Sequence, residues 1–398
     1  MTVQNFYSRD TREIALKGPH KDLPPIMCEM ENMRDAIETG FQNAWNVSGP
    51  GGTGGLILAL PEEYGFNPVL NPPTDRAYYP TLLYFPAGFD VGGTLYKYLC
   101  IHAGDVDAGG GLLLDGSQDF KTWVQLNGGN PLVGLPASAH HPFVLQTGPS
   151  AFRLYYWNSS TLYTVAAIRT AVSTDLINWT SDQPLQNGAT PIVTGVFPNW
   201  NRGSYGVGHA FYNPTASNTG TNPFDYSYVI YFDGTTGAFE SYGLGYSADG
   251  VTFELWGLVL DHGSTVFGNA IPWDASYATF GQIFQTPLGK WMMFYSGGKS
   301  ASHEGVGVAV SDDRLHWTKL SVYSPLLAPV AGTWRDNRCY AVGILTDFTN
   351  RFSGAGDEAD MKMLVSGRSA SGDYTCGYFN VPYMYADVRE ALYRLGKL

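Results

Sequence analysis

Residues 71–384 consist of short apolar runs separated by polar, glycine-rich turns, and the pattern repeats five times. Each repeat begins with an apolar run, at 78–85, 140–146, 207–212, 279–285 and 339–345. A second, aromatic-rich run follows in each repeat, at 95–103, 152–158, 226–233, 290–296 and 360–366. Runs of this length, bounded by turn residues and rich in aromatic and β-branched side chains, predict β-strands.

A seven-residue motif, Ser-x-Asp-x-x-x-Trp, follows these runs. It starts at Ser117, Ser173 and Ser311, and a fourth copy starting at Ser247 ends on Phe instead of Trp. In the fifth repeat, around 369–373, the aromatic residue is absent. Ser and Asp side chains bond the local backbone and hold a tight turn, and the aromatic residue anchors that turn against a core.

Self-similarity at a period of tens of residues is typical of repeat architectures. Four short antiparallel strands in each of five repeats predict an all-β fold, a five-bladed β-propeller of four-stranded blades. We expect the propeller to span 71–384.

The flanking segments do not share the repeat. Apolar residues recur at helical spacing in 26–45, which predicts one helix in an N-terminal arm of residues 1–70. A short strand at 56–60 would close the ring against the last blade or, alternatively, the arm would dock to a partner protein. The tail, residues 385–398, is also predicted to be helical.

Composition narrows the function. The chain has 398 residues with a net charge of −12, which disfavours binding to phosphate backbones and so to nucleic acid. No apolar run is long enough to cross a membrane, and we expect no membrane insertion. The N-terminus shows no secretory signal pattern, so we expect cytoplasmic synthesis and a place in a virion or another extracellular assembly.

The four cysteines favour free thiols, with a Cys339–Cys376 bridge as the alternative.

The repeat count and the Ser-x-Asp-x-x-x-Trp motifs resemble the superfamily of five-bladed propeller glycosidases, which includes arabinanases, β-xylosidases, invertases and levansucrases. The segment 228–256, with its Tyr-Phe-Asp-Gly at 231–234, is most similar to them. Sialidases are the rival, but their motif has one more residue before the Trp and a Gly inside it, and they have six blades. The resemblance implies carboxylates from separate blades that act as nucleophile or base, as general acid and as a pKa-tuning group.

Two of the three positions implied by the resemblance carry no acid here. The second blade has His140-His141-Pro142 where an Asp is expected before Pro, and the third has Gly208-His209-Ala210 where a Glu is expected. Asp75 is the candidate for the acid of the first blade, and Asp233, Glu240 and Glu304 are candidates that would substitute for the missing acids from loops.

Substrate-binding candidates are the remaining polar and aromatic residues expected at the strand entries and loops: Arg76, His140, His141, His209, Trp200, Tyr205, Tyr277, Asp336 and Arg338. The three histidines either bind sugar hydroxyls and one another or hold a metal ion. Because no local ligand spacing such as His-x-x-x-His is present, we expect no metal and no cofactor.

Three hypotheses follow. The first is a propeller that binds an oligosaccharide or polysaccharide with weak or no hydrolysis. The second is an active glycoside hydrolase with relocated carboxylates. The third is a structural part of a larger assembly, such as a viral attachment protein, docked through residues 1–70.

Overall fold

The computed structural model describes residues 61–72, 76–104, 110–158, 168–188, 190–192, 203–235, 239–263, 273–285, 291–299, 305–320, 325–345 and 361–381. The helices expected at 26–45 and 385–398, and the strand expected at 56–60, lie outside these residues. The described residues belong to one compact unit, 61–381. Their regular elements are β-strands, with two short 3-10 turns, Asn127–Gly129 and Pro223–Asp225, and the described residues include no α-helix.

The first two sheets each have four antiparallel strands in chain order. The first sheet comprises β2 (Tyr78–Val91), β3 (Thr94–Ala103), β4 (Leu112–Ser117) and β5 (Trp123–Gln125). The second comprises β6 (Ala139–Gly148), β7 (Ala151–Asn158), β8 (Ile168–Ser173) and β9 (Thr180–Pro184), and is followed by the small pair β10 (Gln186–Asn187) and β11 (Thr190–Pro191).

The third sheet has eight strands, which divide into two antiparallel sets of four. One set comprises β12 (Gly203–Tyr212), β13 (Tyr228–Thr235), β14 (Glu240–Ser247) and β15 (Glu254–Leu260). The other comprises β16 (Tyr277–Gln285), β17 (Trp291–Gly298), β18 (Gly305–Ser311) and β19 (Thr318–Lys319). A single parallel pair, Glu240 with Tyr277, joins the two sets.

The last sheet combines β20 (Arg338–Ile344), β21 (Met361–Arg368) and β22 (Tyr374–Val381) with β1 (Glu62–Glu63) from the other end of the unit. Glu63 anchors β1, because its carboxylate accepts hydrogen bonds from the Trp334 indole and the Arg335 guanidinium, both at 2.7 Å. Each of the ten runs predicted from the sequence corresponds to one of the observed strands, and β2 and β12 are longer than predicted.

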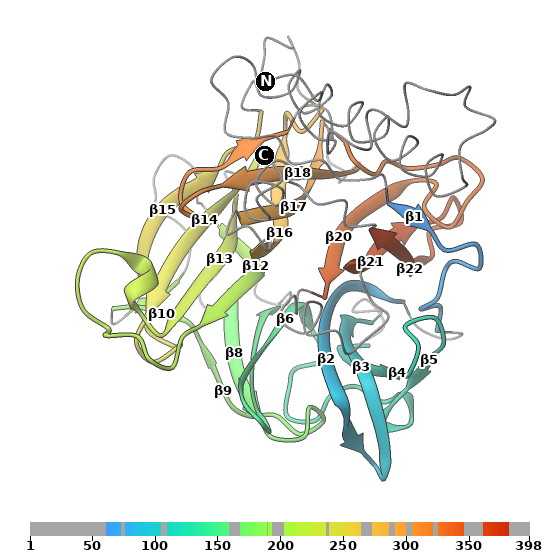
Figure 1. The fold of residues 1–398 in the computed structure, drawn as a ribbon, viewed down its shortest axis with the longest axis horizontal. Helices are drawn as coiled ribbons and strands as arrows, with labels where there is room; N and C mark the ends of the chain where they lie inside the picture. Colours follow the sequence, from blue (N-terminus) through green and yellow to red (C-terminus); the bar gives the residue numbers. More distant parts are fainter. Residues whose placement is uncertain are drawn as a thin grey trace, which may run out of the picture. The chain divides into compact units, whose positions relative to one another are not determined.

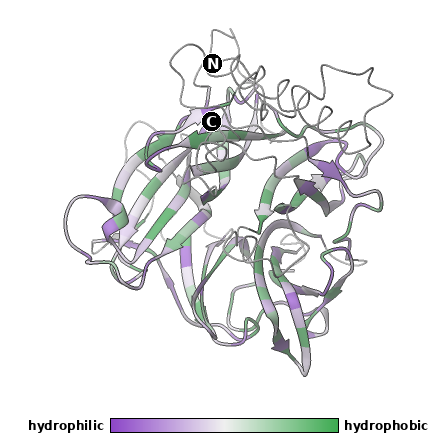
Figure 2. Cartoon of the chain, in the orientation of Figure 1, coloured by the Kyte–Doolittle hydropathy of each residue, from purple (hydrophilic) through white to green (hydrophobic). Residues whose placement is uncertain are grey.

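The first strands of the sets face one another (Figure 1). β2 contacts β6, β6 contacts β12, β12 contacts β16, β16 contacts β20, and β20 contacts β2. The buried side chains lie between neighbouring sets. Along several strands, apolar and polar residues alternate (Figure 2), as expected where one side of a strand faces a core.

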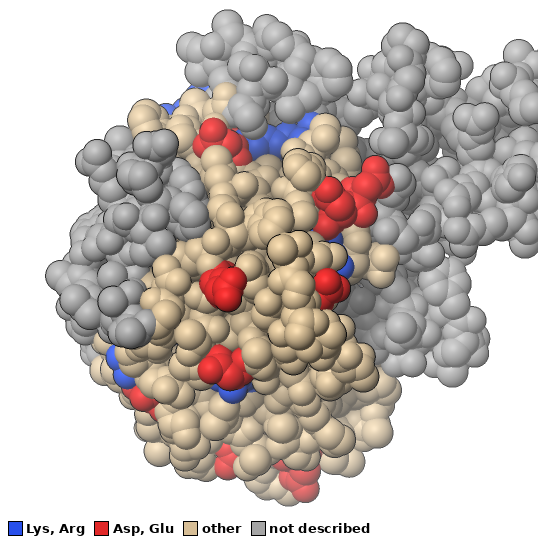
Figure 3. Space-filling view, turned by 90° about the vertical axis from the view of Figure 1, so that its left-hand side faces the viewer, with Lys and Arg blue, Asp and Glu red and all other residues tan. Residues whose placement is uncertain are grey.

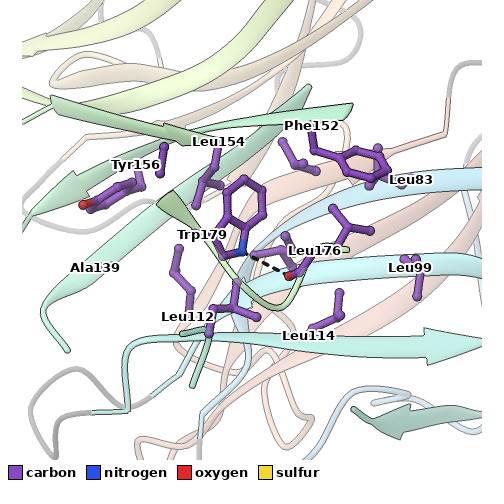
Figure 4. Close-up of a cluster of buried hydrophobic side chains, with 14 of the residues drawn as sticks. Leu83, Leu99, Leu112, Leu114, Ala139, Phe152, Leu154, Tyr156, Leu176 and Trp179 are labelled. Atoms are coloured by element: carbon purple, nitrogen blue, oxygen red, sulfur yellow. Dashed lines mark hydrogen bonds between the residues drawn. The ribbon is translucent and has the colours of Figure 1, made fainter. Parts of the chain in front are cut away.

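One core cluster shows how neighbouring sheets are held together (Figure 4). Leu99, Leu112 and Leu114 of the first sheet pack against Phe152 and Leu154 of the second. Trp179 completes this cluster from the turn that follows β8, and its indole donates a hydrogen bond to the Leu176 carbonyl at 3.1 Å. The aromatic residue of the repeated motif therefore anchors its turn against the core, as the sequence predicts.

The four complete motifs form the same turn. In the last copy, Ser311 Oγ accepts from the Arg314 N–H at 2.8 Å, while Asp313 Oδ1 accepts from the N–H groups of Leu315 and His316. Arg314 has φ 67°, the left-handed region, and the Trp317 indole donates to its carbonyl at 3.0 Å. The copy without Trp has Gly250 at this position, where a positive φ costs little.

Cys339 and Cys376 are buried free thiols, so the alternative of a bridge between them is wrong; Cys100 is also a buried free thiol. On the described part of the face shown in Figure 3, most of the surface is uncharged and the charged residues form small separate groups. The described part of the chain contains no helix with the length and apolar character needed to cross a membrane.

Replacing the Asp of one turn tests the role of the motif. Burial acts to raise the pKa of Asp313, but hydrogen bonds from the side chain and backbone of His316 and from Leu315 hold it below its usual range. We expect Asp313→Ala to lower the free energy of unfolding at pH 7 by about 1–2 kcal/mol, because backbone N–H groups lose a charged acceptor. Urea unfolding of both proteins measures this difference.

The pH dependence adds a second measurement. A carboxylate with a lowered pKa contributes stability that is complete above its ordinary pKa of 3.8 and is lost as the pH falls below that value. The difference between Asp313→Ala and the parent should therefore shrink below pH 4. Asp312→Ala is the control, because the turn N–H groups bond to Asp313. An equal loss in both variants would contradict the prediction.

Candidate functional site

The first strands begin, the second strands end and the third strands begin at one edge of the sheets, which we call the entry edge. In the first sheet, Tyr78 pairs with Ala103, which pairs with Leu112. In the last sheet, Arg338 pairs with Arg368, which pairs with Tyr374. The residues that the sequence predicts for binding fall largely at this edge.

Each first strand is irregular close to its start. Four of them have a register shift and a non-glycine residue with positive φ: Tyr79 (55°), His141 (45°), Phe280 (49°) and Ala341 (44°). The fifth, β12, has two register shifts, the second between Val207 and His209. Strained backbone of this kind persists only where its surroundings fix it, and it is frequent at functional sites.

Side chains from the neighbouring set fix three of these bulges. The N–H groups of Tyr79 and Ala341 donate to Ser366 Oγ at 2.9 Å and to Ser296 Oγ at 2.7 Å. The Phe280 N–H donates to Asp233 Oδ1 at 2.9 Å. Asp233 therefore occupies, near the end of β13, the position that the two serines occupy near the ends of β17 and β21.

A small cavity of about 20 Å³ lies between the five first strands. Each strand contributes two residues to its lining: Tyr79, Pro80, His141, Pro142, Val207, Gly208, Phe280, Gln282, Ala341 and Val342. This volume holds about one water molecule and no sugar ring. Aromatic contacts fill the centre, including ring centroids 3.7 Å apart for Tyr79 and His141 and 4.6 Å apart for His141 and Phe280. A ligand larger than water must therefore bind outside this cavity.

Two histidines are held in the neutral form by burial. Burial lowers the pKa of His140 and of His209 from 6.5 to about 3. His140 Nε2 forms a 2.7 Å hydrogen bond with the Tyr78 hydroxyl, and its buried Nδ1 has no hydrogen-bond partner. His209 Nδ1 accepts from the Ile283 N–H at 3.2 Å. His141 is also buried and packs against Trp157, with ring centroids 5.1 Å apart.

Asp233 and Glu240 are the two predicted catalytic residues that the structure describes. Burial raises the pKa of Asp233 well above its usual range; the Phe280 N–H opposes this shift and the charge of Glu240 adds to it. Asp233 is fully buried, and its Oδ2 has no hydrogen-bond partner. Glu240 begins β14 and is half-buried. Asp75 and Glu304 lie outside the described residues.

The other predicted binding residues are spread along the entry edge. Arg76 lies over the Tyr374 ring at 5.5 Å, and Arg338 and Tyr277 begin β20 and β16. Asp336 Oδ2 accepts from the Gly332 N–H at 2.5 Å and so belongs to a local turn. Trp200 lies outside the described residues, and Tyr205 lies within β12.

Two aromatic residues near the entry edge, Tyr374 and Tyr340, were not predicted from the sequence. Tyr374 begins β22 and stacks on Tyr78, with centroids 4.7 Å apart. Tyr340 lies two residues into β20 and packs against Tyr79 at 5.3 Å. The position of Tyr374 follows from the predicted strands, because antiparallel pairing places the start of a third strand beside the end of a second. Among the described residues, no three His, Cys, Asp or Glu side chains are arranged to hold a metal ion.

The sequence matches no protein-family model and no curated protein. Solved structures show the fold. A protein of the GH130 family of mannoside phosphorylases, which contains glycoside hydrolases that target β-1,2 mannosidic linkages in Candida mannan, has 14% identity and a TM-score of 0.51, over 81% of this chain and 94% of that one. A glycosyl hydrolase from Bacteroides ovatus has 13% identity and a TM-score of 0.50, over 81% and 94%.

A third similar structure is an N-acetylgalactosamine deacetylase from F. plautii in complex with blood group B trisaccharide, with 16% identity, a TM-score of 0.50 and coverage of 82% and 94%. At these identities the likeness concerns the fold alone. The chain thus has a glycoside hydrolase-like β-propeller fold.

Replacing His140 tests whether the entry edge holds neutral histidines. A lowered pKa means that the histidine takes up a proton on unfolding, so its contribution to stability is complete above pH 6.5 and is lost as the pH falls towards 3. At pH 5 the loss is about 2 kcal/mol for one such group. We expect the parent to lose about 2 kcal/mol more than His140→Phe between pH 7 and pH 5, as measured by urea unfolding.

His316→Phe is the control, because the side chain of His316 is 87% exposed. It should keep the pH dependence of the parent protein closely. If His140→Phe also kept the whole pH dependence, His140 would not be held neutral.

Proposed function

We propose that this chain is a five-bladed β-propeller that binds a saccharide at its entry edge and hydrolyses it weakly or not at all. The blade count is supported by the division of the eight-stranded sheet into two sets of four and by the five first strands, each of which contacts the next. On this count, β1 supplies the outer strand of the fifth blade.

Saccharide binding is supported by the similar solved structures, which are glycoside hydrolases and another carbohydrate-active enzyme. Two half-buried aromatic residues at the entry edge, Trp157 and Tyr374, offer ring faces and edges of the kind on which sugars pack. Because the central cavity has room for about one water molecule, we place the saccharide above it, against the entry edge.

The single observation that carries weak hydrolysis is the chemistry of the first-strand starts. The positions at which related glycosidases place acids are occupied by His140-His141 and Gly208-His209. His140 and His209 stay neutral down to about pH 3. Neither supplies a carboxylate nucleophile, and neither is protonated at neutral pH to act as a general acid.

One observation favours a second candidate, a hydrolase with relocated acids. A carboxyl with a raised pKa near a second carboxylate is the arrangement of a general acid with a base or nucleophile. Asp233 and Glu240 have this electrostatic relation. Two observations count against a catalytic role for Asp233. Its Oδ1 accepts a hydrogen bond from the Phe280 N–H, and its side chain is fully buried. A docking role for residues 1–70 stays a prediction from the sequence.

A glycan array and a hydrolysis screen on the same protein separate these functions. We expect binding to at least one saccharide and no turnover of aryl-glycosides or arabinan above background. The second candidate instead requires turnover that falls by about 100-fold or more in Asp233→Asn and Glu240→Gln.

Asp75→Asn extends the test to the carboxylate outside the described residues. Turnover abolished by any one of the three substitutions, in a variant that unfolds at the parent's temperature, would replace the binding proposal with the hydrolase. Absence of both binding and turnover on a broad panel would reject the two together.

A further inference from the structure

Two arginines and one tyrosine form a row across the entry edge of the last sheet. Arg338 of β20 pairs with Arg368 of β21, which in turn pairs with Tyr374 of β22. Directly paired residues project from the same side of a sheet. The two arginines therefore lie on one side of the sheet, and Arg368 is next to the tyrosine.

This side of the sheet faces the first strand of the first sheet. Tyr374 stacks on Tyr78, with ring centroids 4.7 Å apart, and Ser366 on the same side bonds the Tyr79 N–H. The guanidinium carbon of Arg368 lies 5.3 Å from the Tyr374 ring centroid, and that of Arg76 lies 5.5 Å from it. Two cationic side chains, Arg76 and Arg368, thus lie close to one half-buried aromatic ring, and Arg338 pairs with Arg368 on the neighbouring strand.

The arrangement is electrostatically unfavourable by itself. Like charges directly opposite each other on paired strands are destabilising. The Arg368 Nε is buried without a hydrogen-bond partner, and no described carboxylate pairs with Arg338 or Arg368. Nearby acids are used elsewhere: Asp373 accepts from Ser371 and from the backbone-bonded Ser369. In a chain with a net charge of −12, such a cationic row requires a reason.

We propose that the row formed by Arg338, Arg368 and Tyr374 binds the carboxylate of an acidic saccharide, a uronic acid residue within an oligosaccharide. A guanidinium is planar and presents paired N–H donors that match the two oxygens of a carboxylate. The anion relieves the repulsion between the arginines and gives the Arg368 Nε an acceptor. This inference rests on the proposed function, because it names the class of saccharide bound at the entry edge.

Titration calorimetry with three probes tests the inference: a trigalacturonate, the same trisaccharide after reduction of its carboxyl groups, and inorganic phosphate. We expect the trigalacturonate to bind about tenfold or more tightly than the reduced, neutral trisaccharide. Its affinity should fall as NaCl is raised from about 50 to about 500 mM, because exposed ion pairs are screened.

Variants identify the residues. Arg368→Met should weaken trigalacturonate binding by about tenfold or more. Arg368→Lys should retain part of the affinity, because the positive charge stays but the paired N–H donors of the guanidinium are lost. Arg338→Met gives a second test if Arg368→Met fails to fold. Lys362→Met is the control: it makes the same change in net charge on the same strand, near the other end of β21, and should bind as the parent does.

The outcomes separate this inference from the proposed function. Equal binding of the acidic and the reduced trisaccharide, unchanged in Arg368→Met, would reject the carboxylate site and leave saccharide binding in place. Phosphate binding as tight as trigalacturonate binding would show a general anion site and reject the saccharide assignment. If these trisaccharides and a broad glycan panel all fail to bind, the proposed function falls as well.

Discussion

The backbone of the first strands sets the strictest demand in this structure. These strands bulge around the central cavity, where little water can reach, and a buried N–H group without an acceptor is costly. Ser296, Ser366 and Asp233 supply acceptors from the neighbouring set. Each of these bonds joins two sets of strands, so the same contact that satisfies a bulge also fixes the position of one set beside the next.

This demand limits what the centre can do chemically. A serine hydroxyl meets it at little cost, but at Asp233 the acceptor is a carboxyl that burial drives towards its neutral form. The remaining central space is filled by aromatic rings and by histidines that burial keeps neutral. Charged side chains that could act on a ligand lie instead at the entry edge, where Glu240, Arg338 and Arg368 remain partly exposed.

The sequence predicted the structural features that depend on residues close to one another along the chain. Strand runs and turn motifs were located because alternating apolar patterns and the Ser and Asp bonds are local, as in the turn around Asp313. The role of Asp233 was not visible, because its partner, Phe280, is 47 positions away and is defined only by packing between sets. Tyr374 was missed for the same reason: its place beside Arg368 follows from strand pairing, and its stacking on Tyr78 from the contact between the last and first sheets.

The pairing of β1 with β22 has a consequence for how the protein acquires its structure. Asn67 and Tyr378 exchange two hydrogen bonds across 311 positions of sequence. On a ribosome, the last sheet cannot recruit this strand until β22 has emerged, whereas the earlier sheets pair strands that are close in sequence. The entropy cost of loop closure grows only slowly with loop length. This late pairing therefore affects the time that folding takes more than the free energy of the folded state. Until it is complete, β22 presents an open edge to any neighbouring chain.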